Sequence, residues 1–383
     1  NMYLYMLDAA AELDYRFVLI TYEQKEFEIS SSEKNEISEF LSSRNIHWVP
    51  LRWHSGHFKL LKKFYDLILG MLVVLKFRVK GFNRIVSLAT VSGSFAYIFS
   101  RIFRMRHYLY QYEPHSEFMH DFGFWKETSL SFKFLNWLER ISGKNSEVVA
   151  TGTVHMIERL KEMKSMAEVI KIPSCVNDSL FQFSENDRVS IRSELGITDR
   201  KVLIYLGKFG GIYFEREVFE LFRTLFTLDP EFLFMVLTPN PKSEIEDFFQ
   251  EVGISEDNFH IGRVPYKEVY KYISASDIGL VSVPPYPSQK FRSPIKVGEY
   301  LCCGIPYIVC KGISEDDSVA SVNEVGIVLE DFSKASIEAK FDQINELLGT
   351  DKSLLQQRCR EVGISYRGYS QLRQTSLDAF RKL

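Results

Sequence analysis

Short apolar runs alternate with helical stretches along most of this chain, and this alternation constrains its fold more than any other feature. The first run, Arg16 to Thr21, is apolar over its centre, a pattern typical of a strand that is buried on both faces. Strands spaced by helices predict α/β domains with parallel sheets that helices cover on both sides. We expect strands at 16–21, 46–51, 84–88, 107–112, 147–151, 201–206, 232–237, 259–261, 278–283 and 307–310, and helices at 2–13, 32–43, 58–79, 93–103, 130–144, 215–226, 242–252, 267–275 and 296–302.

Two domains are expected, because 383 residues exceed the size of about 250 to 300 residues at which single cores stop growing. Turn-forming residues from Pro173 to Asp178 separate two series of strands. We predict a Rossmann-like domain at 1–174, a second at 175–365, and a C-terminal helix at 366–383 that packs on the first domain. Doubly wound domains normally open with a strand and a glycine-bearing turn, so the first strand is expected to be missing here.

The cysteines and acidic residues show no metal-binding spacing. The five cysteines form no Cys-x-x-Cys pair, so we expect free thiols in a reducing cytoplasm. No Asp-x-Asp pair occurs, and Glu315-Asp316-Asp317 is interpreted as a solvated loop, so no metal is expected. The apolar run 67–79 contains Lys76 and Arg78 and is shorter than a membrane span, and no signal peptide is expected.

Basic residues concentrate between Leu51 and Tyr110, where eleven lysines and arginines accompany one acidic residue, Asp66. Lysines and aromatic rings share the segment 58–65, as on a helix that lies on anionic lipid. An ordinary solvated helix face would explain the same charges, and no nucleic-acid partner is expected because no nucleic-acid-binding module is found. The basic residues are Arg52, Lys59, Lys62, Lys63, Lys76, Arg78, Lys80, Arg84, Arg101, Arg104 and Arg106, and the aromatic residues of the segment are Phe58, Phe64 and Tyr65.

A glycine-bearing segment, Tyr205 to Tyr213, follows a buried strand and precedes a helix. Gly207, Gly210 and Gly211 would let backbone amides approach a phosphate, and Lys208 would add positive charge. The spacing is not Gly-x-Gly-x-x-Gly, which disfavours a nicotinamide or flavin cofactor. The alternative is that these glycines only shape a tight turn between strand and helix.

A second motif, Arg292 to Pro306, begins a helix with Pro294, which suits the first helical position, and its free amides can face an anion. Ser293 would cap this helix or donate to a phosphate. Lys296 and Glu299 are three residues apart and so share one helix face, which would place an ammonium for a diphosphate beside a carboxylate for ribose hydroxyls.

This second motif resembles the donor-binding signature of the GT-B glycosyltransferases, in particular the retaining group 1 (GT4-like) family. Further segments resemble that family in the same order along the chain: 172–177 its interdomain segment, 205–213 its phosphate loop, 261–266 with Arg263 and Val264 its base-contacting loop, and 275–280 its strand entry. The resemblance implies two facing Rossmann-like domains with an interdomain cleft, the first binding the acceptor and the second the nucleotide sugar.

Two departures from the family pattern affect the site. Phe291 stands eight residues before Glu299, where the family often has a second glutamate, so only the ribose-binding member is matched. The frequent Arg and Lys pair after the phosphate strand is represented by Lys208 alone, so neutralising a diphosphate would rest on Lys208, Lys296 and Arg292.

The candidate catalytic residues are Glu113 and His115, which follow the predicted strand 107–112 at its carboxyl end, where open α/β sheets present their ligands. Similar enzymes place an acidic residue or a histidine in this loop, near the sugar and the acceptor hydroxyl. Either residue could orient or deprotonate that hydroxyl. A purely structural histidine is the alternative.

The interpretation that these motifs favour is a cytoplasmic glycosyltransferase that carries a sugar from a nucleoside-diphosphate sugar to an acceptor hydroxyl, with retention, without a metal and without a cofactor. The basic stretch favours a glycan or lipid-linked acceptor, synthesis of polysaccharide or lipopolysaccharide, and peripheral contact with the inner membrane face. The alternatives are a nucleotide-sugar epimerase or hydrolase on the same fold, or a non-catalytic nucleotide-sugar-binding or scaffold protein.

Overall fold

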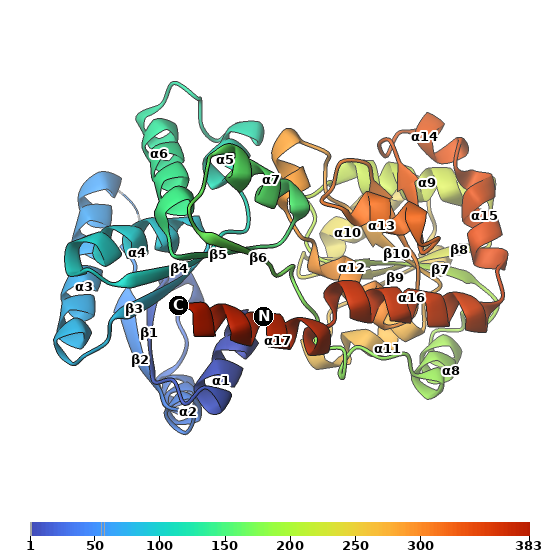
Figure 1. The fold of residues 1–383 in the computed structure, drawn as a ribbon. Coiled ribbons are helices and arrows are strands. Elements are labelled where there is room, and N and C mark those ends of the chain that lie inside the picture. The colour runs from blue at the N-terminus through green and yellow to red at the C-terminus, as the bar shows by residue number, and fades with distance from the viewer. Residues whose placement is uncertain (1, 55, 57) are drawn as a thin grey trace.

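The structure, a computed structural model, describes residues 2–54, 56 and 58–383. Two α/β halves lie side by side, and Figure 1 shows the elements from α1 (Met2–Glu12) to β6 (Glu168–Lys171) in one and most of the later elements in the other. Every strand pair in the described residues is parallel. The predicted α/β class with parallel sheets is confirmed.

In the part of the N-terminal half that the structure describes, six strands form two sheets. β1 and β2 pair with each other, and the other four strands follow the order β3-β4-β5-β6. The strands are β1 (Phe17–Glu23), β2 (Ile46–Arg52), β3 (Arg84–Leu88), β4 (Arg106–Tyr110), β5 (Val148–Thr151) and β6 (Glu168–Lys171). The helices are α1 (Met2–Glu12), α2 (Ser31–Ser42), α3 (Lys59–Val79), α4 (Thr90–Phe103), α5 (His115–Asp121), α6 (Leu130–Asn145) and α7 (Val154–Glu162).

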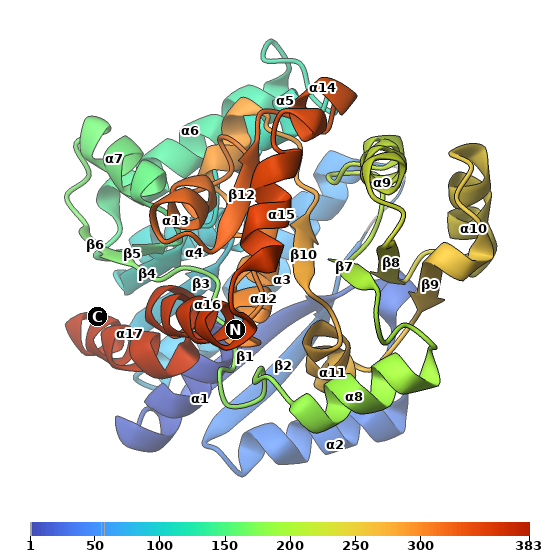
Figure 2. The same ribbon diagram turned by 90° about the vertical axis from the view of Figure 1, so that its right-hand side faces the viewer.

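The C-terminal half is a six-stranded sheet in the order β12-β11-β10-β7-β8-β9. Figure 2 shows α9 and α10 on one side of these strands and α8 and α11 on the other. The strands are β7 (Lys201–Leu206), β8 (Phe232–Leu237), β9 (Phe259–Gly262), β10 (Ile278–Val281), β11 (Tyr307–Cys310) and β12 (Gly326–Leu329). The helices are α8 (Glu185–Glu194), α9 (Arg216–Leu228), α10 (Lys242–Glu251), α11 (Val269–Ser274), α12 (Ile295–Cys302), α13 (Asp316–Val322), α14 (Lys334–Glu338), α15 (Phe341–Gly349) and α16 (Lys352–Arg367), and the chain ends with α17 (Tyr369–Lys382).

The strand order reverses between β7 and β10, because β8 and β9 extend the sheet on one side and β11 and β12 on the other. Loops at the carboxyl ends of the two central strands diverge at such a point and leave a crevice where α/β proteins bind ligands. The fold therefore places the loop after β7 and the segment from β10 to α12 around one crevice.

Aromatic side chains build much of the C-terminal core and account for the high aromatic content of the sequence. Phe222 stacks on Phe234 with ring centroids 4.4 Å apart, and Phe249 stacks on Phe259 at 4.1 Å. All of these rings except that of Phe259 are fully buried. This core holds the central strands whose carboxyl ends frame the crevice.

The chain crosses between the halves twice. Val176, after β6, and Gly368, between α16 and α17, form an isolated parallel bridge, with the Val176 amide donating to Arg367 O and the Tyr369 amide donating to Val176 O, both at 2.9 Å. α17 then packs on the N-terminal half, where Phe380 stacks on Tyr108 at 5.4 Å. The C-terminal helix predicted at 366–383 begins at Tyr369 in the structure, because Gly368 adopts extended backbone (φ −66°, ψ 131°) to form the bridge and separates α17 from α16.

Candidate active site

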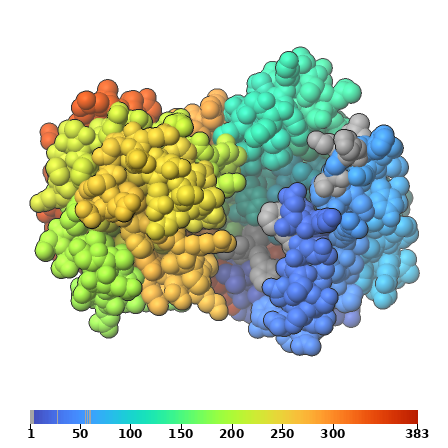
Figure 3. All heavy atoms as spheres, turned by 180° about the vertical axis from the view of Figure 1, so that it is seen from behind, coloured from blue at the N-terminus to red at the C-terminus, as the bar shows by residue number. Residues whose placement is uncertain are grey.

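A cleft lies between the two halves, and Figure 3 shows the molecular surface hollowed there. The carboxyl end of the C-terminal sheet faces it with three loops, at 207–215, 238–240 and 262–266, and with the start of α12. The Phe214 amide donates to Ser282 O at 3.1 Å and so joins the loop after β7 to the loop after β10. The predicted phosphate loop 205–213 and the segment that leads to α12 thus border the same crevice.

The loop after β7 depends on its glycines. Gly207, Gly210 and Gly211 have φ of +141°, +73° and +67°, values that side chains disfavour. The Phe209 amide donates to Asn240 Oδ1 at 3.1 Å, which fixes the loop to the end of β8. Lys208 is exposed, and no carboxylate among the described residues pairs with it. The geometry fits both interpretations of this loop, an approach to phosphate and a tight turn.

In α12 Pro294 stands just before the helix and not at the first helical position that the sequence predicts for it. Pro294 is the N-cap and Ile295 the first helical residue, and no side chain caps the helix. Ser293 does not cap it, because its hydroxyl oxygen accepts from the Ser174 amide at 3.0 Å and from the guanidinium of Arg367. The first amides of α12 therefore have no partner within the helix and can donate hydrogen bonds to an anion.

Lys296 and Glu299 form an ion pair on the first turn of α12, with Nζ 2.9 Å from Oε2. Glu299 is 1% exposed, whereas the side chain of Lys296 is 31% exposed. The other carboxylate oxygen of Glu299, Oε1, is buried and has no hydrogen-bond partner among the described residues. Burial and the nearby Glu299 carboxylate raise the pKa of the Tyr266 hydroxyl. A buried acceptor without a donor is costly, and either the neighbouring Tyr266 hydroxyl or a hydroxyl-bearing ligand would satisfy it.

Arg263 and Val264, in the loop after β9, take different positions. Arg263 is exposed, whereas Val264 is half-buried and packs against the C-terminal core. Tyr266 follows two residues later, beside Glu299, so this loop reaches the Lys296–Glu299 pair through Tyr266.

Glu113 and His115 come together at the cleft side of the N-terminal half. His115 Nδ1 lies 3.6 Å from Glu113 Oε1, and the ring of His115 stacks on Phe118 at 5.7 Å. Arg292 reaches across from the C-terminal half, with Nε 3.4 Å from Glu113 Oε2. The guanidinium assigned by sequence to a diphosphate thus pairs with the candidate catalytic carboxylate in this structure.

No family model matches the sequence, and no curated protein matches it either. Solved structures match nearly the whole chain. HepE from Anabaena, in complex with UDP, is 12% identical with a TM-score of 0.70 over 99% of this chain and 96% of that one. Sucrose-phosphate synthase from Thermosynechococcus elongatus is 14% identical with a TM-score of 0.67 over 96% and 98%. WaaG, a glycosyltransferase involved in lipopolysaccharide biosynthesis, is 15% identical with a TM-score of 0.63 over 94% and 98%.

These structural neighbours are GT-B glycosyltransferases. This chain has the GT-B fold. Its two halves correspond to the two facing domains of that fold, and the crevice between β7 and β10 opens into the cleft between them.

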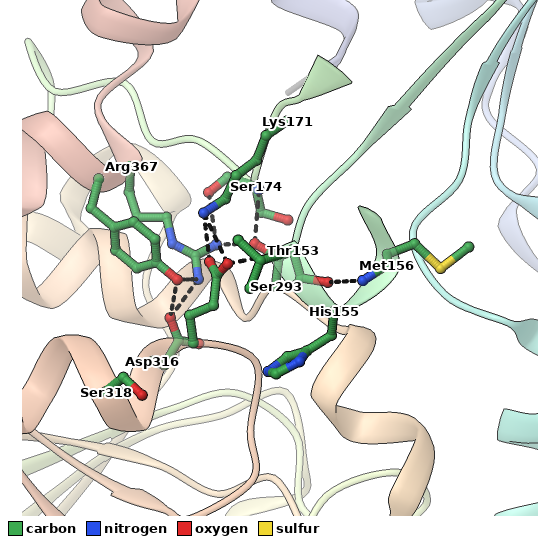
Figure 4. Close-up of polar contacts among 12 residues, drawn as sticks. Thr153, His155, Met156, Lys171, Ser174, Ser293, Asp316, Ser318 and Arg367 are labelled. Atoms are coloured by element: carbon green, nitrogen blue, oxygen red, sulfur yellow. Dashed lines mark hydrogen bonds and ion pairs between the residues drawn. The ribbon is translucent and has the colours of Figure 1, made fainter. Parts of the chain in front are cut away.

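A polar network that the sequence did not predict joins the two GT-B halves beside α12. Figure 4 shows Lys171 of the first half and Ser174 of the crossing beside Ser293, Asp316 and Arg367 of the second half. Glu315 accepts from Lys171 Nζ at 2.7 Å and from the Val154 amide at 2.7 Å. The interpretation of Glu315 to Asp317 as a solvated loop is wrong, because these long-range partners draw the first two carboxylates out of water.

Arg367 and Asp316 form the buried centre of this network, 2.5 Å apart and both 0% exposed. The guanidinium also donates to Ser293, the residue before the N-cap of α12. Gly298 allows this arrangement, because a Cβ there would lie 2.6 Å from Val176 Cγ2 and 2.8 Å from Arg367 Cβ. α12 is therefore held directly against the interdomain crossing.

Glu139 supports the start of α5, on which His115 lies. Its carboxylate accepts from the Ser116 amide at 3.0 Å and from the Ser116 hydroxyl at 2.5 Å. Burial raises the pKa of Glu139 from its ordinary value of 4.5 to about 7. Nothing in the sequence distinguishes Glu139, since it is one of several charged residues on an amphipathic helix.

Within 2–54, 56 and 58–383, no three His, Cys, Asp or Glu side chains come together as a metal site would require. In that same part of the chain, no helix combines the length and apolar character needed to cross a bilayer.

Proposed function

We propose that this chain is a glycosyltransferase that moves a sugar from a nucleoside-diphosphate sugar to an acceptor hydroxyl. The observation that carries the proposal is the Lys296–Glu299 pair at the uncapped start of α12, at the point where the strand order reverses. The free amides and Lys296 suit a diphosphate, and the unpaired Oε1 of Glu299 suits a ribose hydroxyl.

Fixed positive charge would drive the reaction in this proposal. As the glycosidic bond to the diphosphate breaks, negative charge grows on the leaving oxygen. The amides of α12, Lys296 and Lys208 would stabilise that charge without a metal, since preorganised dipoles and cations act most strongly where water is excluded. Transfer with retention of anomeric configuration is part of this proposal.

Glu113 and His115 would act on the acceptor side of the cleft. His115 Nδ1 lies 3.6 Å from Glu113 and 31% of its side chain is exposed, so a hydroxyl can reach it. Either group could accept the hydroxyl proton or hold the hydroxyl in place. Arg292 would bring positive charge from the donor side to the same position.

A second candidate is a nucleotide-sugar-binding protein without transfer. Phe291 is 6% exposed and packs with Leu109, Val149, Met156 and Leu160 of the N-terminal half. A buried ring therefore occupies the position where the family often has its second glutamate, and it contributes no charge to the reaction. A nucleotide-sugar epimerase or hydrolase on the same fold would instead consume the donor without an acceptor.

Donor binding and turnover separate these candidates. We would measure thermal shifts with UDP-, GDP-, ADP- and CMP-linked sugars, beginning with UDP because the HepE neighbour was solved with it. Turnover would follow with and without acceptors. Lys296→Ala and Glu299→Ala should abolish transfer and leave the fold intact. Binding without turnover supports the second candidate, acceptor-independent turnover supports the epimerase or hydrolase, and full transfer by both variants refutes the donor-site assignment.

We also propose that α3 rests on an anionic membrane surface, which would favour a lipid-linked acceptor in polysaccharide or lipopolysaccharide synthesis. α3 lies at the outer edge of the N-terminal half (Figure 1). An apolar stripe follows one face at helical spacing, each member between 41% and 80% exposed: Leu61, Phe64, Tyr65, Leu72, Leu75 and Val79. Lys76 and Lys80 flank it, while the side chain of Lys59 lies outside the described residues.

Liposome sedimentation tests this surface. Leu72→Glu should reduce recovery on anionic vesicles, because it puts a carboxylate where the stripe would enter the lipid. Leu354→Glu is the matched control, since Leu354 is 59% exposed on α16 in the other half. Equal recovery of wild type on anionic and neutral vesicles would refute the membrane proposal and would not bear on the donor-site assignment.

A further inference from the structure

A cavity of about 500 Å³ lies at the amino ends of the C-terminal strands. Lys201, which begins β7, and Pro306, which precedes β11, line it together with residues of α8, α15 and α16. We call this cavity the amino-edge pocket. The donor crevice lies at the carboxyl ends of the same strands, so the length of β7, six residues or roughly 20 Å, separates the two. Figure 1 shows α8 and α15 on the side of the C-terminal half that faces away from the cleft.

Basic side chains outnumber acidic ones in the amino-edge pocket, by five to two among the described residues. Lys201 is neutralised from outside the pocket by Asp229, whose Oδ2 lies 2.6 Å from the lysine Nζ. The pocket therefore keeps an excess of two positive charges. The five basic residues are Arg188, Arg192, Arg200, Lys201 and Lys352, and the two carboxylates are Asp199 and Asp277.

Two arginines of α8 meet one carboxylate beside the pocket. Arg188 Nη2 lies 2.6 Å from Asp277 Oδ1, and Arg192 Nη1 lies 3.2 Å from Asp277 Oδ2. Both arginine side chains are more than nine-tenths buried, and they also donate to backbone oxygens at 198–200 and 274–276. Carbonyl oxygens hold the guanidinium groups in place but do not cancel their charge. The three side chains therefore keep one positive charge in a poorly solvated position.

Lys352 brings a third positive charge to the same place. It is the first residue of α16, and its ammonium forms no hydrogen bond or ion pair with any described residue. Burial and the nearby Arg188 guanidinium lower the pKa of Lys352, and Asp277 only partly offsets them. The Asp351 side chain already caps α16, so the group that an anion would satisfy is the Lys352 ammonium and not the helix amides.

Neutral donors and apolar walls complete the pocket. Gln356 lies one turn after Lys352 on α16, and within the described residues its side-chain amide makes no hydrogen bond. Phe183, Leu348 and Leu355 supply apolar surface. The volume lies within the range of about 300 to 1,000 Å³ that small-molecule sites have. The pocket thus offers donors at one place and apolar surface for an organic group at another.

We propose that the amino-edge pocket binds a phosphate monoester of a small organic molecule. A phosphate monoester carries close to two negative charges at pH 7, which matches the excess of two positive charges in the pocket. Its oxygens would accept hydrogen bonds from Lys352 and Gln356, and its organic part would lie against the apolar walls. This site is separate from the donor site and does not depend on the proposed transfer reaction.

Other occupants match the pocket less well. A bare phosphate ion would leave the apolar surface of Phe183 and Leu348 uncovered. A neutral sugar would leave both positive charges without a counter-charge, and a monocarboxylate would leave one of them. Only a ligand with a doubly charged group and an organic part uses all the features of the pocket.

Isothermal titration of the whole chain tests the proposal. The probes are glucose 6-phosphate and glycerol 3-phosphate, and the controls are glucose, glycerol and inorganic phosphate. We expect at least one of the two monoesters to bind with a Kd of about 1 mM or lower. The matching alcohol and inorganic phosphate should bind at least about tenfold more weakly, because each lacks one of the two parts that the pocket contacts.

Four variants locate the binding. Lys352→Ala removes the ammonium, and Gln356→Glu puts a carboxylate of similar size into the pocket. Each should weaken binding of the monoester by about tenfold or more. Lys334→Ala and Gln357→Glu are the matched controls, because Lys334 is likewise the first residue of its helix, α14, and Gln357 follows Gln356 but does not line the pocket. Both control variants should bind the monoester like wild type.

Three outcomes would overturn the proposal. The first is that neither monoester binds more tightly than its alcohol. The second is that binding survives in Lys352→Ala and Gln356→Glu but is lost in Lys296→Ala, which would place the ligand at the donor site. The third is that inorganic phosphate binds as tightly as the monoesters, which would mean a site for a bare anion only. The donor-site assignment is tested separately, by titrating the same variants with nucleoside diphosphates, which should bind Lys352→Ala as they bind wild type.

Discussion

Replacing Glu299 by glutamine tests the proposed donor site most directly. The substitution preserves the volume of a side chain that is 1% exposed, and it removes the negative charge and one acceptor oxygen. Oε2 already accepts from Lys296 at 2.9 Å, and Oε1 has no partner among the described residues. If the amide oxygen remains with Lys296, the NH₂ group takes the position of Oε1 and cannot accept from a ribose hydroxyl.

The expected loss of nucleotide affinity follows from the strength of a hydrogen bond to a charged carboxylate. A hydrogen bond to a charged group contributes roughly 1.5 to 3 kcal/mol, which corresponds to about 10- to 150-fold in Kd. Stability should change by less than about 1 kcal/mol, because Lys296 is one-third exposed and its ammonium can turn to water. Glu299→Gln should therefore weaken nucleotide binding, while its Tm should stay close to that of wild type.

Isothermal titration with the nucleoside diphosphate that binds wild type gives the affinity, and calorimetric unfolding gives Tm. Glu330→Gln is the matched control, because Glu330 forms an exposed pair with Lys311 at 3.0 Å. That variant should bind like wild type. A Glu299→Gln variant whose Kd stays within twofold of wild type would show that this carboxylate does not contact the nucleotide.

Three further predictions concern the supports of the site. Glu139 has a higher pKa in the folded than in the unfolded chain, so its contribution to the free energy of unfolding is complete below about pH 4.5 and is lost as the pH rises to about 7. The loss is roughly 3 kcal/mol at most. Urea unfolding of Glu139→Gln should not show this fall in stability with pH. Gly298→Ala should destabilise by about 1 to 3 kcal/mol through its contacts with Val176 and Arg367, whereas Gly349→Ala, with open space around it, should not lower Tm. Asp316→Asn should cost about 3 to 5 kcal/mol by leaving a buried guanidinium without its counter-charge, measured as the shift of the urea midpoint.

The central strands could be predicted from sequence because their residues are apolar on both faces. β7 and β8 lie at the predicted 201–206 and 232–237. β12, with only the four residues Gly326–Leu329, was not predicted, and neither were α5, α7, α8 and the helices α13 to α15. Short elements such as these carry too few periodic positions to stand out, and their packing partners lie far away in the sequence.

Spacing along the sequence identifies some contacts around the site but not those between distant residues. Lys296 and Glu299 could be paired from sequence, because their spacing alone brings them to one face of a helix. Ser293 could not be assigned in this way, since its partner Arg367 lies 74 residues further along the chain. The same long-range side chain holds Asp316 in the interior, although the acidic run around it resembles an exposed loop.

The paired crossings at Val176 and Gly368 restrict how the cleft can open. Two backbone segments hydrogen-bonded side by side tolerate bending about their common line far better than sliding or separating, so relative motion of the halves should be a rotation about that line. A protease that cut the chain at Val176 would leave the halves joined only by noncovalent contacts, among them the packing of α17 on the N-terminal half, because all five cysteines are free. Because the start of α12 packs on this line through Gly298, a rotation that narrows the cleft would reorient a donor bound there only slightly.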